Sequence, residues 1–153
     1  MKIEYRRLTE KELNTFIDMR IKQLREEGAK EDIDLAPALK QYYIRHMGDG
    51  TFVSWLAFDG DRIIGTSGMS FVEKPPYFGC PSGKIGLLSG MFTDPDYRRK
   101  GIAKELLTRV VHDAKERCRS QRQIWALSYI RTLDLFRIKI LCNINFRDSN
   151  HCQ

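Results

Sequence analysis

Residues 91–103 read MFTDPDYRRKGIA, and the rest of the chain is organised around this stretch. They lie between an apolar run at residues 85–92 and an amphipathic run that begins at Ile102. The pattern predicts a strand that ends in a basic, glycine-containing loop and continues into a helix. The first N–H groups of a helix have no intrahelical acceptor, and the helix dipole adds partial positive charge there. The stretch therefore predicts an anion-binding site.

The residue types in the loop suit a ligand that carries phosphate. Gly101 has no Cβ, so a ligand can come close to the backbone. Arg98, Arg99 and Lys100 supply positive charge, and a guanidinium group can bind phosphate through two parallel hydrogen bonds. The alternative is an ordinary helix start whose basic residues are solvated.

Residues 98–103, RRKGIA, match the Arg/Gln-x-x-Gly-x-Gly/Ala motif of the GNAT superfamily of N-acetyltransferases. The setting of the motif is also similar to that family, because a strand and the segment TDPDY precede it and a long helix follows. In the family this loop holds the pyrophosphate of acetyl-CoA. The resemblance therefore implies a GNAT-like acyl-CoA N-acyltransferase fold, with acetyl-CoA as the cosubstrate.

The resemblance also implies which residues contact acetyl-CoA and its acceptor. The strand end at Met91, Phe92 and Thr93 would supply backbone contacts that polarise the thioester carbonyl. The region between the first two helices borders the acceptor site in the family, so Glu26 and Glu27 are candidates to face a cationic amine. The loop and the helix start would hold the pyrophosphate, through Arg98, Arg99, Lys100, Gly101, Ile102, Ala103 and Lys104.

Acetyl transfer to an amine requires the amine to lose a proton, and the leaving thiolate can gain one. The sequence shows no Ser/His/Asp or Cys/His constellation, which fits direct attack without an acyl-enzyme. The catalytic residues stay unknown, since Glu26, Glu27, Glu73 and water are all candidates for the general base. The three histidines are scattered along the chain, so we expect no metal site.

Length and composition predict one globular domain over residues 1–153. Hydrophobic residues make up 42% and charged residues 30% of the chain, as in soluble proteins. No apolar run approaches the roughly 20 residues that span a bilayer, and the N-terminus has no signal-peptide layout. The four cysteines form no C-x-x-C pair. We therefore expect a cytoplasmic protein with reduced thiols and no membrane partner.

The order of expected elements is typical of an α/β protein whose α+β core holds a mixed sheet. A short strand is followed by two helices, then three antiparallel strands, the phosphate loop and a long helix. Glycines inside the strands predict bulges or close contacts at Gly65 and Gly68, and bulges or a close ligand approach at Gly86 and Gly90. The strands are expected at residues 2–6, 51–58, 62–72 and 84–93, and the helices at 9–28, 34–48 and from about 101.

The net charge of +6 comes from the second part of the chain. Residues 1–97 hold 13 Lys and Arg against 15 Asp and Glu, whereas residues 98–153 hold 13 against 5. A basic tail can indicate nucleic-acid binding, but no aromatic residues interleave with this charge to form a stacking platform. We therefore expect no nucleic-acid partner, and we expect a small-molecule or peptide amine as the substrate.

The C-terminal region departs from the family pattern. Family members commonly carry the motif Leu-Tyr-x-x-Phe-Gly-Phe, whose Tyr donates a proton to the CoA sulfur, and this chain lacks it. We expect the likeness to end near Cys118, with an atypical tail that holds at best a strand at residues 123–127. An exposed apolar run at residues 135–141 would favour a homodimer. The alternative function is a CoA-binding protein with weak or no catalysis.

We predict that the tail is a shifted reading frame of an ordinary gene of this family. Read one nucleotide earlier, the codons allowed for residues 124–126 permit Asp-Met-Gly. Those for residues 128–135 permit Leu-Tyr-Ser-Asp-Phe-Gly-Phe, which is the missing motif. The alternative is a diverged C-terminus that matches by coincidence. Sequencing the gene checks the hypothesis, which fails if the upstream frame does not encode the motif.

Overall fold

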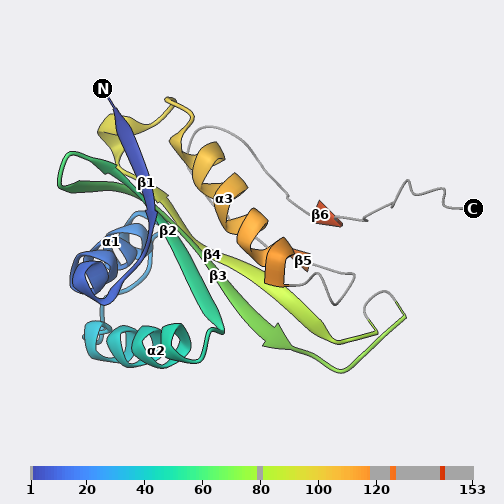
Figure 1. Ribbon diagram of the computed structural model, residues 1–153. Helices are drawn as coiled ribbons and strands as arrows, with labels where there is room; N and C mark the ends of the chain where they lie inside the picture. Colours follow the sequence, from blue (N-terminus) through green and yellow to red (C-terminus); the bar gives the residue numbers. More distant parts are fainter. Residues whose placement is uncertain (1, 79–80, 118–124, 127–141, 144–153) are drawn as a thin grey trace, which may run out of the picture.

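The computed structural model describes residues 2–78, 81–117, 125–126 and 142–143 (Figure 1). Its centre is a four-stranded sheet in the order β1-β2-β3-β4, in which every neighbouring pair is antiparallel. The strands are β1 (Ile3–Arg7), β2 (Phe52–Asp59), β3 (Arg62–Glu73) and β4 (Lys84–Thr93). Two short strands, β5 (Trp125–Ala126) and β6 (Cys142–Asn143), pair with each other, and β5 lies beside β4.

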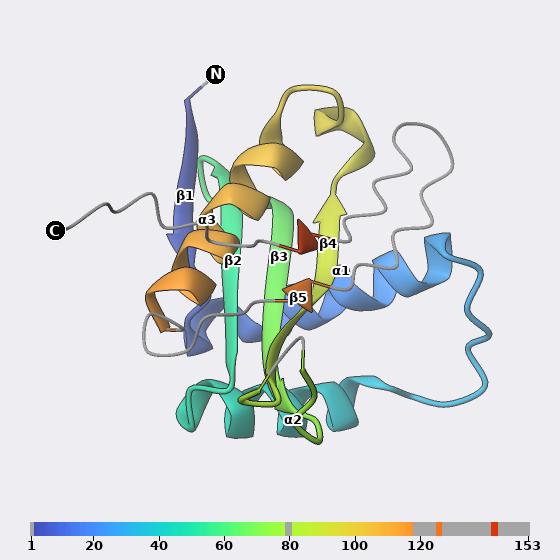
Figure 2. The same ribbon diagram turned by 90° about the vertical axis from the view of Figure 1, so that its right-hand side faces the viewer.

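Helices cover both faces of the sheet. Helix α1 (Leu13–Glu26) and helix α2 (Ala36–Gly48) lie on one face, and α3 (Ile102–Arg117) lies on the other (Figures 1 and 2). Short 3-10 turns, η1 (Glu10–Glu12) and η2 (Pro95–Tyr97), lead into α1 and out of β4. The expected order of elements and the α/β class are confirmed. Within the residues that the structure describes, however, the four-stranded sheet contains only antiparallel pairs.

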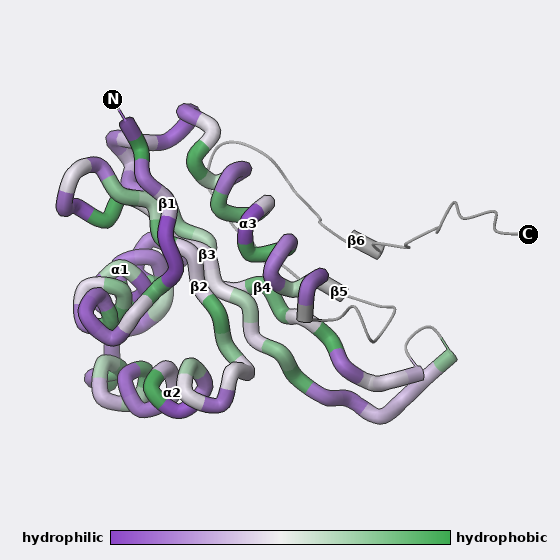
Figure 3. Tube along the Cα trace, viewed as in Figure 1, coloured by the Kyte–Doolittle hydropathy of each residue, from purple (hydrophilic) through white to green (hydrophobic). Residues whose placement is uncertain are grey.

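Helix α3 carries the apolar stripe that its sequence predicts. Ile102, Leu106, Val110 and Ala114 are completely buried against the sheet. Hydrophobic and hydrophilic residues alternate around its turns in Figure 3. Full burial of a side chain of this kind contributes roughly 1.5–3 kcal/mol, so the stripe is enough to fix α3 on the sheet. Ala103, next to the stripe at the helix start, is exposed.

A β-bulge at Gly90 interrupts β4. Thr66 of β3 pairs with Phe92 and Gly68 pairs with Ser89, so two steps along β3 correspond to three along β4. Gly90 has φ +62, a left-handed conformation that favours glycine. The extra residue reverses the faces of the strand. Leu88 therefore packs on the α3 side and Phe92 on the α1 side.

The other glycines inside the strands divide between two outcomes. The close contact expected at Gly65 is confirmed, because a Cβ there would lie 3.0 Å from Leu106 Cδ1. A Cβ on Gly68 would lie 2.9 Å from the ring of Phe52. Gly86, by contrast, pairs regularly with Phe71 of β3, so of the two alternatives expected there the bulge is wrong.

The buried face of α1 agrees with its helical spacing only in part. Leu13, Phe16 and Ile17 are buried, whereas Ile21 and Leu24, which have the same helical spacing, are only partly buried. Met19 and the polar Gln23 are also buried there. In α2 the buried residue is Tyr43, whereas the neighbouring Tyr42 is 38% exposed.

A buried carboxylate ties α3 to the first two strands. Asp113 of α3 accepts hydrogen bonds from Arg7 Nε at 2.9 Å, Arg7 Nη2 at 2.8 Å and Trp55 Nε1 at 2.8 Å. Three donors at one buried carboxylate satisfy its acceptor sites and hold its charge in an apolar layer.

Part of the C-terminal prediction lies within the described residues. The strand expected at residues 123–127 is confirmed at Trp125–Ala126, where β5 forms. The expected interface at residues 135–141 lies outside the described residues. In the part of the chain that the structure describes, no helix is long and apolar enough to span a membrane.

Candidate functional site

The loop between η2 and α3 has the conformation of an anion-binding turn. Arg99 has φ +63 and Gly101 has φ +80, so two left-handed residues turn the chain into α3. Glu105 N–H donates to Gly101 O at 3.1 Å, which closes the first turn of the helix. The N–H groups of residues 102–104 precede this bond and have no intrahelical acceptor. They form a cluster of donors at the positive end of a 16-residue helix.

The space over this loop is open. A Cβ placed on Gly101 would meet no atom within 4 Å, and Ala103 and Lys104 are exposed. Among the described residues, the structure gives the Arg99 side chain no hydrogen bond or ion pair. Lys100 Nζ donates to Asp96 O at 3.2 Å and lies 4.9 Å from the ring centroid of Tyr97. A ligand therefore has access to the backbone donors, with Arg99 and Lys104 beside them.

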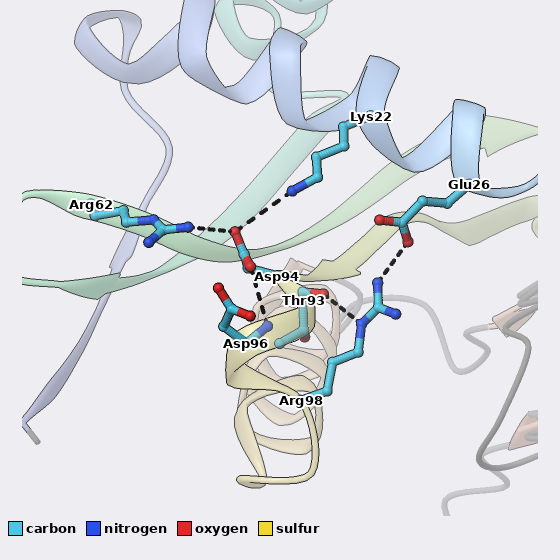
Figure 4. Close-up of polar contacts among 7 residues, drawn as sticks. All are labelled: Lys22, Glu26, Arg62, Thr93, Asp94, Asp96 and Arg98. Carbon is cyan, nitrogen blue, oxygen red and sulfur yellow. Dashed lines mark hydrogen bonds and ion pairs between the residues drawn. The ribbon is translucent and has the colours of Figure 1, made fainter.

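A buried carboxylate fixes the turn that leads into the loop. Asp94 accepts hydrogen bonds from Arg62 at 2.9 Å and from its own turn at Asp96 N–H, and it lies 3.7 Å from Lys22 Nζ (Figure 4). Burial acts to raise the pKa of Asp94, but the Asp96 N–H, Lys22 and Arg62 together lower it below its usual value. The carboxylate stays charged and anchors η2 to β3 and α1.

Arg98 points away from the anion-binding turn. Its Nε donates to Thr93 O at 3.0 Å and its Nη2 donates to Glu26 Oε2 at 2.6 Å (Figure 4). The sequence predicted that this guanidinium would meet phosphate. In this structure it bridges the end of β4 and the end of α1 instead.

The two glutamates at the end of α1, candidates for the border of the acceptor site, lie near the end of β4. Glu26 pairs with Arg98, and Glu27 accepts a hydrogen bond from Gln23 Nε2 at 2.9 Å. The Gln23 amide also donates to Met91 O at 3.1 Å. These cross-links bring α1 against the end of β4.

Glu73 does not belong to this group. It lies at the opposite end of the β3–β4 hairpin, where it pairs with Lys84. At about 3.3 Å per residue, Lys84 is roughly 25 Å from Phe92 along β4. Glu73 is therefore too far from the strand end to act as a general base there.

Among the described residues, no strand forms a ladder with the edge of β4 opposite β3, although β5 lies beside it. This free edge carries backbone donors at Met91 and Thr93. Asp94 N–H donates to Ile64 O of β3 at 2.9 Å, so the pleat turns the Thr93 peptide groups to the other edge. The hydroxyl of Thr66 binds Gly90 O at 2.8 Å. A trans peptide places the Met91 N–H opposite that carbonyl, so it also points away from β3. The two N–H groups can donate to a carbonyl oxygen that lies along this edge.

A hollow of about 510 Å³ lies between the second half of α1 and the segment that leads to α2. Its lining is half apolar and half charged: the apolar residues are Ile21, Leu24, Ala29, Ile33 and Leu35, and the charged ones are Arg25, Lys30, Glu31, Asp32 and Asp34. Arg25 and Glu31, which both line it, form an ion pair.

Comparisons with known proteins bear on this arrangement. The model of the acetyltransferase (GNAT) family matches residues 14–137. The match continues past Cys118, so our expected end of the likeness there is too early. No curated protein gave a significant match.

Several solved structures are similar to this one. A predicted acetyltransferase from Clostridium acetobutylicum, solved with acetyl-CoA, is 30% identical with a TM-score of 0.76, covering 83% of this chain and 81% of its own. A GCN5-related N-acetyltransferase from Ralstonia eutropha JMP134 is 22% identical with a TM-score of 0.69, covering 83% and 84%. AAC(6')-Iy, in complex with the bisubstrate analogue CoA-S-monomethyl-acetylneamine, is 19% identical with a TM-score of 0.64, covering 86% and 83%.

Three residues that organise this site escaped sequence reasoning. Gln23 sits in a helical stripe whose other members are apolar, and Thr66 is an ordinary strand former. Nothing in the sequence links either of them to β4. Asp94 did carry a signal, because an Asp before a Pro is typical of a turn start.

We predict a pH-dependent loss of stability in Asp94→Asn. The pKa of Asp94 is lowered in the folded state, so its stabilisation is present above its unfolded pKa of about 3.8. It is lost as the pH falls through the folded pKa. Denaturant unfolding should show the variant about 2 kcal/mol less stable at pH 7, with the gap closing below about pH 3.8.

The exposed Asp61 gives a matched control, since Asp61→Asn makes the same change in the β2–β3 turn. That variant should follow the wild type at every pH. A gap for Asp94→Asn that stays constant from pH 7 to pH 3 would contradict the role given to its charge.

Proposed function

Because the chain belongs to the acetyltransferase (GNAT) family, we propose that it transfers an acetyl group from acetyl-CoA to a primary amine of a small molecule or peptide. The observation that carries the proposal is the strand, loop and helix at residues 91–104. Free backbone donors there lie next to an open glycine and a strand edge with two outward N–H groups.

In this proposal the pyrophosphate of acetyl-CoA lies over the start of α3. The N–H groups of Ile102, Ala103 and Lys104 donate to it, and Arg99 adds a guanidinium. Gly101 leaves room for the phosphate oxygens, which fits its empty surroundings. Arg98 contributes to the pyrophosphate site through its backbone, because its side chain is bonded to Glu26 and to the Thr93 carbonyl.

The thioester arm would then follow the free edge of β4. The N–H groups of Met91 and Thr93 are the donors available to the arm and to the thioester carbonyl. The Phe92 side chain is buried between β4 and α1, so it fixes the strand rather than contacting the ligand.

The reaction is a direct transfer in which atoms balance without an added reagent. The amine nitrogen attacks the thioester carbon, the C–S bond breaks, the amine loses a proton and the CoA sulfur gains one. Water or a carboxylate at the end of α1 takes the proton from the amine. When the thioester and the amine are bound in line with each other, the transfer needs no covalent enzyme intermediate.

We propose that the acceptor amine enters beside the end of α1. Glu27 supplies negative charge there, together with the Glu26 carboxylate, which is shared with Arg98. The hollow near Ile21 and Leu24 provides a partly apolar surface. A cation with a short apolar portion matches this combination. The bisubstrate analogue bound to AAC(6')-Iy contains an aminoglycoside fragment, which makes small polyamines and amino sugars the first amines to test.

A second candidate function is binding of CoA with weak or no catalysis. The observation that favours it is the missing Leu-Tyr-x-x-Phe-Gly-Phe motif, because without that Tyr the leaving sulfur lacks its usual proton donor. Steady-state assays of amines separate the two candidates, since both require CoA binding but only the first requires turnover.

We predict that CoA raises the melting temperature of the protein and that Gly101→Asp abolishes the effect. A ligand at 100 times its Kd stabilises by about 2.7 kcal/mol, or roughly 5–10 °C for a domain of this size. The Asp carboxylate would lie where the phosphates bind. Differential scanning fluorimetry with and without CoA makes the measurement.

Gly60→Asp is the matched control. Gly60 has φ +60 and open space around its Cβ position, as Gly101 does, but it lies in the β2–β3 turn. It should lose stability as Gly101→Asp does and still respond to CoA. If saturating CoA leaves the melting temperature of the wild type unchanged, the proposed function is contradicted.

A further inference from the structure

Thr66 is a buried polar residue whose side chain bonds to the backbone of the neighbouring strand. Its exposed fraction is 2%, and its hydroxyl donates to the carbonyl of Gly90 at 2.8 Å. Gly90 is the left-handed residue of the β4 bulge, where the regular ladder to β3 is broken. The Thr66 side chain thus replaces a backbone hydrogen bond that the bulge removes.

The bond to Gly90 controls the next N–H in the chain. Gly90 C=O and Met91 N–H belong to the same planar trans peptide, so they point in opposite directions. Holding the carbonyl toward β3 therefore aims the Met91 N–H at the free edge. Accepting a hydrogen bond also polarises the peptide, which makes its N–H a stronger donor.

We propose that Thr66 is a positioning residue for acetyl transfer, acting through the Gly90–Met91 peptide to aim the Met91 N–H at the thioester carbonyl. This proposal rests on the proposed function. Negative charge develops on the carbonyl oxygen as the amine attacks, and a donor fixed in advance stabilises it without reorganising. Thr66 itself touches neither substrate.

The neighbouring hydroxyls of β3 do not share this position. The Ser67 hydroxyl makes only long contacts, at 3.4 Å to Leu106 O and 3.5 Å to Trp55 O. The Ser70 hydroxyl bonds with Tyr42 OH at 3.0 Å, on the α2 side. Of the Thr66, Ser67 and Ser70 hydroxyls, only that of Thr66 bonds to the bulge, so Ser70 offers a matched control on the same strand.

The test compares Thr66→Val, Thr66→Ser and Ser70→Ala. Valine keeps the shape and removes the donor, whereas serine keeps the donor. We expect kcat of Thr66→Val to fall roughly tenfold, less than the roughly hundredfold or greater loss seen when an oxyanion donor is removed outright. KM for acetyl-CoA and the thermal shift with CoA should stay within about twofold of wild type. Thr66→Ser and Ser70→Ala should keep wild-type kcat.

Three results would overturn the proposal. Thr66→Val could keep wild-type kcat, Thr66→Ser could lose as much as Thr66→Val, or the CoA response could be lost together with kcat. If Thr66→Val does not fold, Thr66→Cys replaces it. It is compared with Thr66→Ala, which has no donor. The weak S–H donor of Thr66→Cys should give a kcat between those of wild type and Thr66→Ala.

A second readout separates this proposal from the proposed function. If the wild type acetylates no amine, the proposed function has failed, but the Met91 amide still reports on Thr66. In ¹H–¹⁵N NMR spectra of the free protein, the Met91 proton should move upfield in Thr66→Val and keep its position in Thr66→Ser. An unchanged Met91 resonance in Thr66→Val would overturn the positioning role.

Discussion

The extra residue at Gly90 sets the geometry of everything that follows it in the chain. It lets Leu88 face α3 while Phe92 faces α1, so one strand serves both apolar layers. It also turns the Met91 N–H away from β3, just before the regular ladder resumes at Phe92. Because β4 runs directly into η2 and the basic loop, the bulge places the strand edge and the anion-binding turn side by side. In a regular strand without the extra residue, Leu88 and Phe92 would lie on the same face of the sheet.

The charges around the loop divide into structural pairs and free groups. Lys22 and Arg62 are held by Asp94, and Arg98 is held by Glu26. These pairs join α1 and β3 to the end of β4. Their basic side chains are already paired with carboxylates, so they should not be counted as phosphate ligands. The backbone donors at the start of α3 therefore carry most of the anion site, with Arg99 as its nearest guanidinium. A helix N-terminus offers donors at fixed positions and needs no side-chain ordering when the ligand binds.

Much of this fold could be predicted because local patterns determine it. The stripe on α3, the turn at Gly60 and the strand-loop-helix at residues 91–104 each lie within one stretch of sequence. The cross-links of the site could not be predicted in the same way. Arg98 and Glu26 are 72 residues apart and Gln23 and Met91 are 68 apart, and neither pair has a local signature. Thr66 looks like any β-branched residue in a strand, since its role depends on a bulge in the neighbouring strand.

An NMR titration with acetyl-CoA and with CoA examines the site at the level of single N–H groups. With ¹⁵N-labelled protein, both ligands should shift the amides of Ile102, Ala103 and Lys104, because both carry the pyrophosphate. Only acetyl-CoA has a thioester carbonyl, so it should shift the Met91 amide further than CoA does. Shifts confined to other elements, such as α2, with the amides at residues 91–104 unchanged, would contradict the assignment of this strand edge and loop as the acetyl-CoA site.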